Sequence, residues 1–194
     1  MIEIADTLLR GGVVLLPTDT IYGLHALAND ARAVQRIVDN NGRGEDKPFV
    51  VIGASRDQLE RAGAVFNDLA RKVVDELWPG PLTAVVPLNQ PIAASRGATT
   101  IAVRVPAVDR LRQLLEKTGP LASTSANRSG EPPLRDPKTM SRQLQDALDA
   151  VVDEGPREGE PSTIVDFTSA EPRFIRSGEA FFTQKVWKTL RKSL

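Results

Sequence analysis

Small hydroxyl and amide side chains are concentrated in one short run that follows an apolar segment. The run PLASTSANRSG at residues 120–130 offers five of them, the hydroxyls of Ser123, Thr124, Ser125 and Ser129 and the amide of Asn127. Burying so many polar groups in a core strand is costly, so we expect this run not to be a core strand. Such small groups can bind phosphate or sugar oxygens with little steric demand. The alternative is a turn network in which they hydrogen-bond only to their own backbone.

A second polar stretch, PTDTIYGL at residues 17–24, follows the apolar segment VVLL. Pro17 stops strand pairing, so the stretch should lie at a strand end. Thr18, Asp19 and Thr20 then provide hydroxyls and a carboxylate where α/β sheets usually hold ligands. A turn in which these side chains cap backbone amides explains the residues equally well.

The third candidate is a charged residue inside an apolar segment, Arg104 in IAVRVP at residues 101–106. An unpaired charge is rarely buried in a core, so Arg104 points either to water or into a cleft that holds an anion. Ala102 and Arg104 lie on the same face of the predicted strand, which favours the cleft.

The loop NNGRGEDKP at residues 40–48 contains glycines together with Arg43 and Lys47. Glycine lets a backbone approach a phosphate closely, and the guanidinium of an arginine matches phosphate oxygens. The spacing of a P-loop is absent. Because Glu45 and Asp46 offset part of the positive charge, a solvated polar turn is the simpler interpretation.

Composition excludes several kinds of chemistry. The chain has no Cys, so a thiol nucleophile, a disulfide and a Cys-based zinc site are excluded. His25 is the single histidine, and we expect it to be structural. The sequence has no cluster of His and carboxylates of the kind that forms a dedicated metal site. Mg²⁺ that arrives with a nucleotide needs only one or two carboxylates, so the sequence still allows this ion.

Charge and hydropathy indicate where the protein acts. Lys plus Arg and Asp plus Glu each number 25, so tight non-specific binding of nucleic acid by the whole surface is not expected. The apolar runs are too short to span a bilayer, and the first residues do not form a signal peptide. We therefore expect a cytoplasmic protein without a membrane segment.

These residues need a scaffold, and the sequence predicts one in which many strands mix with helices in an irregular βαβ alternation. We expect helices over 3–10, 30–40, 55–60, 67–77, 108–117, 137–149 and 181–194. We expect strands over 13–16, 49–52, 82–88, 100–105, 121–122, 163–167 and 173–176. Ser55 and Asn67 are the expected N-caps of two of the helices. This pattern predicts a single α/β domain over residues 1–194, with a mixed sheet that curls around a central cleft.

The order of the motifs resembles the threonylcarbamoyl-AMP synthases of the YrdC/TsaC type. The resemblance covers about residues 5–178 and rests on PTDTIYGL, the loop containing Arg43 and Lys47, WPGPLT, AVRVP, STSANRSG, PSTIVD and IRSG. It implies the short, single-domain form, with a twisted sheet around a large basic cavity. It also implies that the protein makes threonylcarbamoyl-AMP and pyrophosphate from ATP, L-threonine and bicarbonate. Downstream proteins would transfer the group to adenosine 37 of tRNA.

The same resemblance implies roles for individual residues. The threonine site would consist of Thr20, Arg104 and Ser162, with the arginine pairing with the carboxylate. Catalytic roles would fall to Arg43, Ser125 and Asn127. The ATP site, reached together with Mg²⁺, would consist of Asn41, Arg43, Lys47, Thr100, Ser125, Asn127 and Arg176.

Asn41 departs from the family pattern, which has lysine at this position and proline at the position of Gly44. Losing one charge-assisted hydrogen bond to phosphate costs about 1.5–3 kcal/mol, or roughly 10- to 150-fold in binding. The departure leaves open an alternative from another class, a non-catalytic paralogue that binds a nucleotide, tRNA or double-stranded RNA.

Overall fold

A computed structural model describes residues 1–41, 48–127 and 131–193 of the chain. Within these residues the strands form one mixed sheet in the order β7-β1-β2-β6-β3-β5-β4-β8-β9. Their bounds are β1 Val14–Pro17, β2 Tyr22–Leu27, β3 Val50–Ile52, β4 Leu82–Pro87, β5 Thr100–Arg104, β6 Leu121–Ser125, β7 Ala150–Val151, β8 Thr163–Asp166 and β9 Arg173–Arg176. The pairs β1–β7, β3–β5 and β4–β8 are parallel, and the other neighbours are antiparallel.

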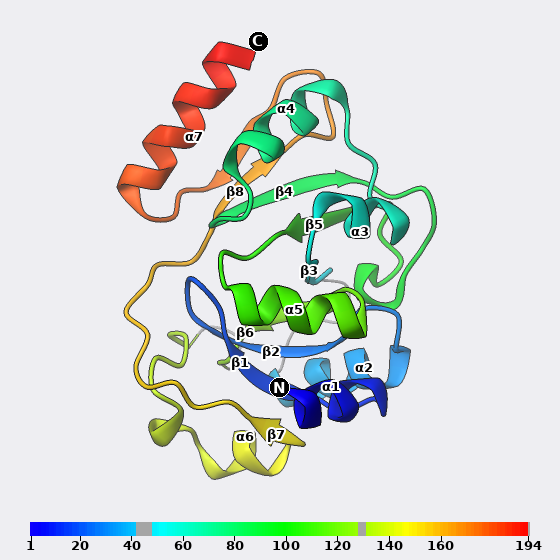
Figure 1. Ribbon diagram of the computed structural model, residues 1–194, viewed down its shortest axis with the longest axis vertical. Helices are drawn as coiled ribbons and strands as arrows, with labels where there is room; N and C mark the ends of the chain where they lie inside the picture. The colour runs from blue at the N-terminus through cyan, green and yellow to red at the C-terminus, as the bar shows by residue number, and fades with distance from the viewer. Residues whose placement is uncertain (42–47, 128–130, 194) are drawn as a thin grey trace.

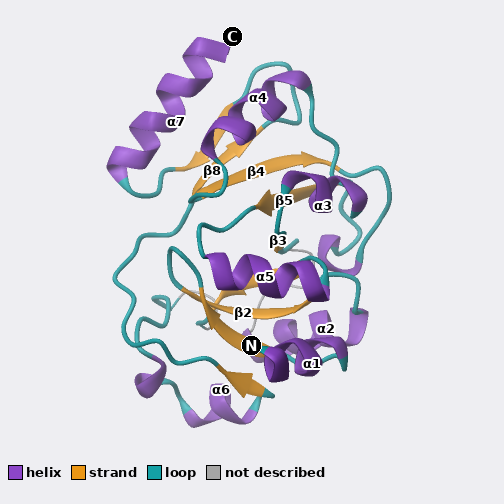
Figure 2. Ribbon diagram, in the orientation of Figure 1, coloured by secondary structure: helices purple, strands orange, loops and turns teal. Residues whose placement is uncertain are grey.

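Helices cover the sheet on more than one side (Figure 1). Their bounds are α1 Ile2–Leu9, α2 Ala31–Asn41, α3 Arg56–Arg61, α4 Asp68–Leu77, α5 Asp109–Thr118, α6 Arg142–Asp146 and α7 Ala180–Ser193. Helix α7 lies beside α4 at one end of the molecule, and α1 contacts α5 on the side that faces the viewer in Figure 1. Figure 2 shows the strands running through the molecule between these helices.

Two hydrophobic clusters lie on opposite faces of the sheet, which explains the continuous apolar run at residues 13–16. In β1, Leu15 packs into the larger cluster, whereas Val14 and Leu16 pack into a smaller one beneath α1 and α5. A strand buried on both faces needs apolar side chains at every position.

Most of the expected elements are confirmed, as are the α/β class and the mixed sheet. The side chain of Ser55 accepts a hydrogen bond from the amide of Gln58, and that of Asn67 accepts one from Ala70. Both residues are therefore the N-caps that the sequence predicted. No helix in the described part of the chain is long and apolar enough to cross a membrane.

The expectation that the Ser/Asn run would not be a core strand is wrong. Strand β6 continues through Ser125, between β2 and β3, with Ser123 opposite both His25 and Val50. The two neighbouring strands satisfy the backbone of the run. Its hydroxyl side chains are only partly buried, so the strand escapes the cost that motivated the expectation.

Two further expectations are corrected. The sequence analysis missed β2, which pairs with β1 as an antiparallel hairpin around residues 18–21. The helix expected over 137–149 is instead a 3₁₀ turn at Pro137–Thr139, the short α6 and then β7. The backbone breaks at Met140, and Ser141 caps a new helix. The carboxylate of Asp149 accepts hydrogen bonds from the amide of Val13 and from Arg36, which holds this end of the segment against β1.

Candidate functional site

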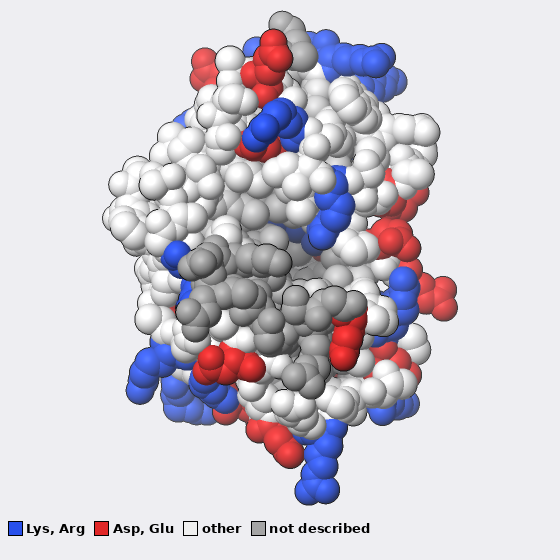
Figure 3. Space-filling view, turned by 180° about the vertical axis from the view of Figure 1, so that it is seen from behind, with Lys and Arg blue, Asp and Glu red and all other residues white. Residues whose placement is uncertain are grey.

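A cleft of about 410 Å³ lies where the ends of several strands meet. Its walls come from strands β2, β3, β4, β5, β6, β8 and β9 and from the segments that flank them. The described lining residues are Thr18, Thr20, Ile21, Tyr22, Gly23, Pro48, Val50, Ile52, Thr83, Ala102, Arg104, Ser123, Thr124, Ser125, Asn127, Glu131, Pro133, Pro161, Ser162, Ile164 and Arg176. The face of the molecule opposite α5 is hollowed near its middle, with Lys and Arg side chains at the edges of the hollow (Figure 3).

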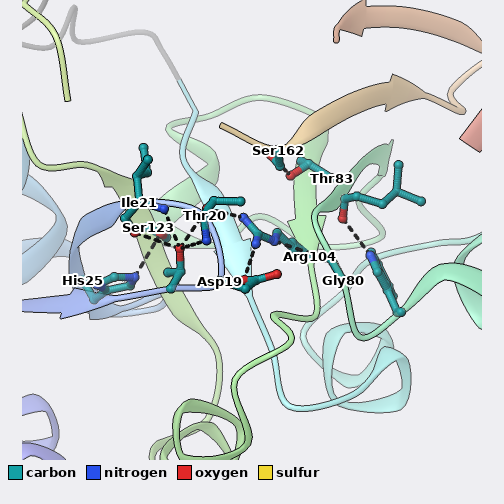
Figure 4. Close-up of polar contacts among 12 residues, drawn as sticks. Asp19, Thr20, Ile21, His25, Gly80, Thr83, Arg104, Ser123 and Ser162 are labelled. Atoms are coloured by element: carbon teal, nitrogen blue, oxygen red, sulfur yellow. Dashed lines mark hydrogen bonds and ion pairs between the residues drawn. The ribbon is translucent and has the colours of Figure 1, made fainter. Parts of the chain in front are cut away.

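Arg104 lies in the wall of the cleft with only 6% of its surface exposed. Its Nε donates to the carbonyl oxygen of Gly80 at 3.2 Å, and its Nη1 donates to Oγ1 of Thr20 at 3.0 Å. Its Nη2 forms an ion pair with Oδ1 of Asp19 (Figure 4). These three contacts fix the plane of the guanidinium and leave two of its five N–H groups for a ligand.

The carboxylate of Asp19 compensates the buried positive charge of Arg104. Its side chain is 12% exposed, and it is not among the described residues that line the cleft. The sequence left two orientations open for the Arg104 side chain, toward solvent or into a cleft that holds an anion. In the structure Arg104 lines the cleft, and its ion pair with Asp19 holds it at the cleft wall.

The loop before β2 is held by hydroxyl contacts. Thr18 Oγ1 lies 2.8 Å from Thr20 Oγ1 and 2.8 Å from the carbonyl oxygen of Ile21. Thr18 Oγ1 also accepts from the amides of Thr20 and Ile21. The turn interpretation of PTDTIYGL is therefore correct, and the same residues also line the cleft.

At Gly159 the backbone of the segment from 153 to 161 lies in close contact with the backbone of Thr20. A Cβ atom at Gly159 would collide with the carbonyl oxygen of Thr20, so only glycine allows this approach. The hydroxyl of Tyr22 donates to the carbonyl of Gly155 at 2.8 Å and accepts from the amide of Glu154 at 2.9 Å. The segment from 153 to 161 is thereby held against β2 and the threonine-rich loop.

Ser162 and Arg176 meet on the opposite wall. Arg176 Nε donates to the carbonyl of Ser162 at 3.0 Å, and Nη2 donates to Ser162 Oγ at 3.2 Å. Burial and, secondarily, the positive charge of Arg104 lower the pKa of Arg176. Two arginines thus act on the same region of the cleft, where a bound anion would relieve their mutual repulsion.

Strand β6 contributes hydroxyl groups to the cleft, and Asn127, two residues after its end, contributes an amide. Ser125 and Asn127 line the cleft, and the Asn127 side chain donates to the carbonyl of Glu131 at 2.8 Å. A neighbouring hollow of about 320 Å³ shares Asn127 and Glu131 with the cleft. Ser123 Oγ lies 3.1 Å from Nε2 of His25. Burial, with a smaller contribution from the charge of Arg104, lowers the pKa of His25 to about 4.

Six of the expected site residues line one cleft: Thr20, Arg104, Ser125, Asn127, Ser162 and Arg176. Thr100 lies at the opposite end of β5 from Arg104 and is not among the described lining residues. Arg43 and Lys47 fall outside the described residues, as does the side chain of Asn41, whose backbone ends α2.

Thr83 is a lining residue that the sequence analysis did not single out. It lies in β4 with no exposed surface, and its Oγ1 is 2.7 Å from Ser162 Oγ. A sequence signal was present but weak, because Thr83 is the one hydroxyl residue in the apolar strand LTAVVP, and threonine is far more common in strands than a charged residue such as Arg104.

The cleft offers one carboxylate for a divalent cation. Glu131 is the acidic residue among the described lining residues. Within the described ranges, no three His, Asp or Glu side chains lie close enough together to hold a metal. Mg²⁺ is commonly held by one or two carboxylates together with substrate phosphates, so these residues fit a cation that arrives with a nucleotide.

Comparison with known proteins gives one consistent result. A family model described as Sua5_yciO_yrdC, telomere recombination, matches residues 6–178. A Pyrococcus abyssi protein named threonylcarbamoyl-AMP synthase is 36% identical over 182 residues, which are 91% of this chain and 54% of that protein. A Chromohalobacter salexigens protein of the same name is 35% identical over 176 residues, covering 87% of this chain and 95% of that protein.

A solved structure extends the similarity to three dimensions. The crystal structure of P. abyssi Sua5 complexed with L-threonine matches with a TM-score of 0.86 and 33% identity. The match covers 95% of this chain and 56% of the Sua5 chain. The chain therefore spans about half the length of its Pyrococcus relative and most of the length of the Chromohalobacter protein.

Proposed function

The chain belongs to the Sua5/YciO/YrdC family, and on this premise we propose that it is an L-threonylcarbamoyl-AMP synthase. The enzyme is a nucleotidyltransferase that converts ATP, L-threonine and bicarbonate into threonylcarbamoyl-AMP and pyrophosphate. The observation that carries the proposal is a single cleft lined by Arg104, Arg176 and several hydroxyl groups. Relatives that share this sequence pattern are named for the same activity.

The threonine end of the cleft is formed by Thr20, Arg104 and Ser162. Arg104 has two N–H groups left after its contacts with Gly80, Thr20 and Asp19, and these bind the carboxylate of threonine. Because the guanidinium is already held in place, little side-chain entropy is lost when the ligand binds. Support comes from the relative whose structure contains L-threonine.

The nucleotide end is formed by Ser125, Asn127 and Arg176, with hydroxyl, amide and guanidinium groups for the phosphates and the sugar. We further assign Thr100, Asn41, Arg43 and Lys47 to ATP, on the resemblance of their motifs. Glu131 is the carboxylate of this cleft that would hold Mg²⁺ bound to ATP. The cation would neutralise charge on the departing pyrophosphate.

The reaction needs positioning more than acid–base chemistry. The amine of threonine adds to the carbon of bicarbonate, and loss of water gives an N-carboxylate. An oxygen of this group attacks the α-phosphorus of ATP, and the bond to the β-phosphate oxygen breaks to release pyrophosphate. Fixed donors such as Arg104 and Arg176 stabilise the anionic groups throughout, as expected for reactions at phosphorus.

The product is an activated threonylcarbamoyl group. We infer that it is consumed by transfer proteins that modify adenosine 37 of tRNA in the cytoplasm. The comparisons do not favour the alternative, a non-catalytic paralogue that binds RNA or a nucleotide, because the relatives carry the name of a synthase.

The test is pyrophosphate release from ATP and Mg²⁺, with threonine and bicarbonate each omitted in turn. We expect release only in the complete mixture. An Asn41→Lys variant, which restores the residue of the family pattern, should release pyrophosphate at least as fast as the wild type. Pyrophosphate release that does not depend on threonine would contradict the proposal, as would no release by either protein.

A further inference from the structure

A buried pair of hydroxyl groups lies behind the threonine end of the cleft. Thr83 is 0% exposed and Ser162 is 5% exposed, and their side-chain oxygens are 2.7 Å apart. Strands β4 and β8 are parallel, with Thr83 opposite Ile164, so Ser162 lies just before the paired segment. Figure 4 shows the two side chains pointing toward one another across this strand pair.

The proton positions in this pair follow from the available acceptors. Ser162 Oγ is the hydrogen-bond partner of Thr83 Oγ1 within the described residues. If Ser162 donated to Thr83, the proton of Thr83 would be buried without an acceptor, at a cost of about 1–3 kcal/mol. Thr83 is therefore the donor, and Ser162 Oγ is the acceptor.

Arg176 occupies the second lone pair of the same oxygen. Its Nη2 lies 3.2 Å from Ser162 Oγ, and a guanidinium can only donate. With both lone pairs of Ser162 filled, its remaining hydrogen-bonding group is its own O–H. Among the described contacts nothing else accepts this hydrogen, so the O–H of Ser162 is directed into the cleft.

We propose that Thr83 is a positioning residue that fixes the hydroxyl of Ser162 as a hydrogen-bond donor to the carboxylate of the bound amino acid. The inference rests on the proposed function, because it takes threonine as the ligand. A carboxylate is the acceptor that fits, since Arg104 and Arg176 supply positive charge to the same region of the cleft. Although Thr83 lines the cleft, its surface is 0% exposed, so we expect it to act on the ligand through Ser162.

The experiment is a double-mutant cycle on threonine affinity, measured by isothermal titration calorimetry. Thr83→Val removes the hydroxyl and keeps the shape, whereas Thr83→Ser keeps the hydroxyl. We expect Thr83→Val to weaken threonine binding about 2- to 12-fold and Thr83→Ser to bind nearly as well as the wild type. In the Ser162→Ala background, Thr83→Val should have no further effect.

Two controls separate positioning from a loss of packing. Thr189→Val removes another buried hydroxyl, which contacts Glu76 on α4, and should leave threonine affinity unchanged. The Thr83→Val enzyme should show a higher KM for threonine with an unchanged KM for ATP. If Thr83→Val does not fold, Thr83→Ala takes its place in the cycle.

The outcomes distinguish this inference from the proposed function. Equal threonine affinity in the wild type and Thr83→Val would overturn the inference alone. So would a loss of affinity that persists in the Ser162→Ala background. The inference would also be overturned if Thr83→Val weakened the binding of threonine but not that of 2-aminobutyrate. The two ligands share a carboxylate and differ in the side-chain hydroxyl, so such a result would show that Ser162 contacts the hydroxyl. A wild type that binds no threonine would remove the proposed function as well.

Discussion

Substitutions in the ion pair between Asp19 and Arg104 should affect the stability of the protein and its affinity for threonine differently. Both side chains are largely buried, with 12% and 7% exposed. Removing one member of a buried pair leaves an uncompensated charge, which costs about 3–5 kcal/mol. Arg104→Met leaves the carboxylate of Asp19 in this situation, because Oδ1 then loses its partner Arg104 and Oδ2 has no hydrogen-bond partner among the described residues.

The double variant Asp19→Asn/Arg104→Met removes both charges. Replacing a buried pair by neutral residues is often close to neutral, so most of the loss caused by Arg104→Met should be recovered. Threonine binding should not recover, because both variants lack the guanidinium that binds the carboxylate. We expect affinity to fall roughly 10- to 150-fold in each.

The assay is urea unfolding of the two single variants and the double variant, with threonine titrations on the same preparations. We predict a coupling free energy of about 2 kcal/mol or more between the two sites. Additive losses of stability would refute the assignment of Asp19 as the partner of Arg104. Recovery of threonine affinity in the double variant would refute the role of Arg104 in carboxylate binding.

Further predictions concern the glycine contact, the buried histidine and a helix cap. Gly159→Ala adds a Cβ that collides with the Thr20 carbonyl, so the KM for threonine should rise roughly tenfold in steady-state kinetics, since such overpacking costs about 1–3 kcal/mol. An unchanged KM would show that the contact does not position the loop. The pKa of His25 is near 6.5 when unfolded and about 4 when folded, so the unfolded state binds the extra proton between these values. Stability should therefore fall by up to about 3 kcal/mol as the pH decreases from 6.5 to 4, and His25→Gln should flatten this part of the curve measured by urea unfolding. Asn67 caps α4 and also donates to the carbonyl of Phe167 after β8. In thermal unfolding, Asn67→Ala should therefore lower the free energy of unfolding by about 1–2 kcal/mol. Ser55→Ala, which loses only a helix cap, should lower it by about 0.5–1 kcal/mol. Equal losses in the two variants would contradict the second contact.

The elements that the sequence predicted well are those with a strong local signal. Helix α4 has apolar residues at helical spacing and an Asn at its N-cap, and the predicted start is confirmed. Strand β1 is an uninterrupted apolar run, as expected for a strand that is buried on both faces. Local chemistry is sufficient in both cases.

The elements that were missed depend on partners far away in the chain. Strand β2 contains Gly23 and His25, and it is stabilised by pairing with β1 and β6 rather than by its own propensity. Strand β6 includes three polar residues that form a strand because β2 and β3 satisfy their backbone. A single sequence does not reveal such pairings.

The same division holds for the site. Arg104 stood out because a charge interrupts an apolar strand, and it does line the cleft. Its partner Asp19 lies 85 residues away in the sequence, so no local pattern could predict the ion pair. Thr83 carries a weaker version of the signal of Arg104, and its contact with Ser162 depends on the parallel pairing of β4 and β8.

The most direct test of the proposed activity is to identify the product formed from carbon-13 bicarbonate, ATP and threonine by mass spectrometry. We predict an adenylate with the mass of threonylcarbamoyl-AMP, heavier by one mass unit than the product from ordinary bicarbonate and absent without threonine. ATP that stays intact, or an adenylate that carries no label, would contradict it.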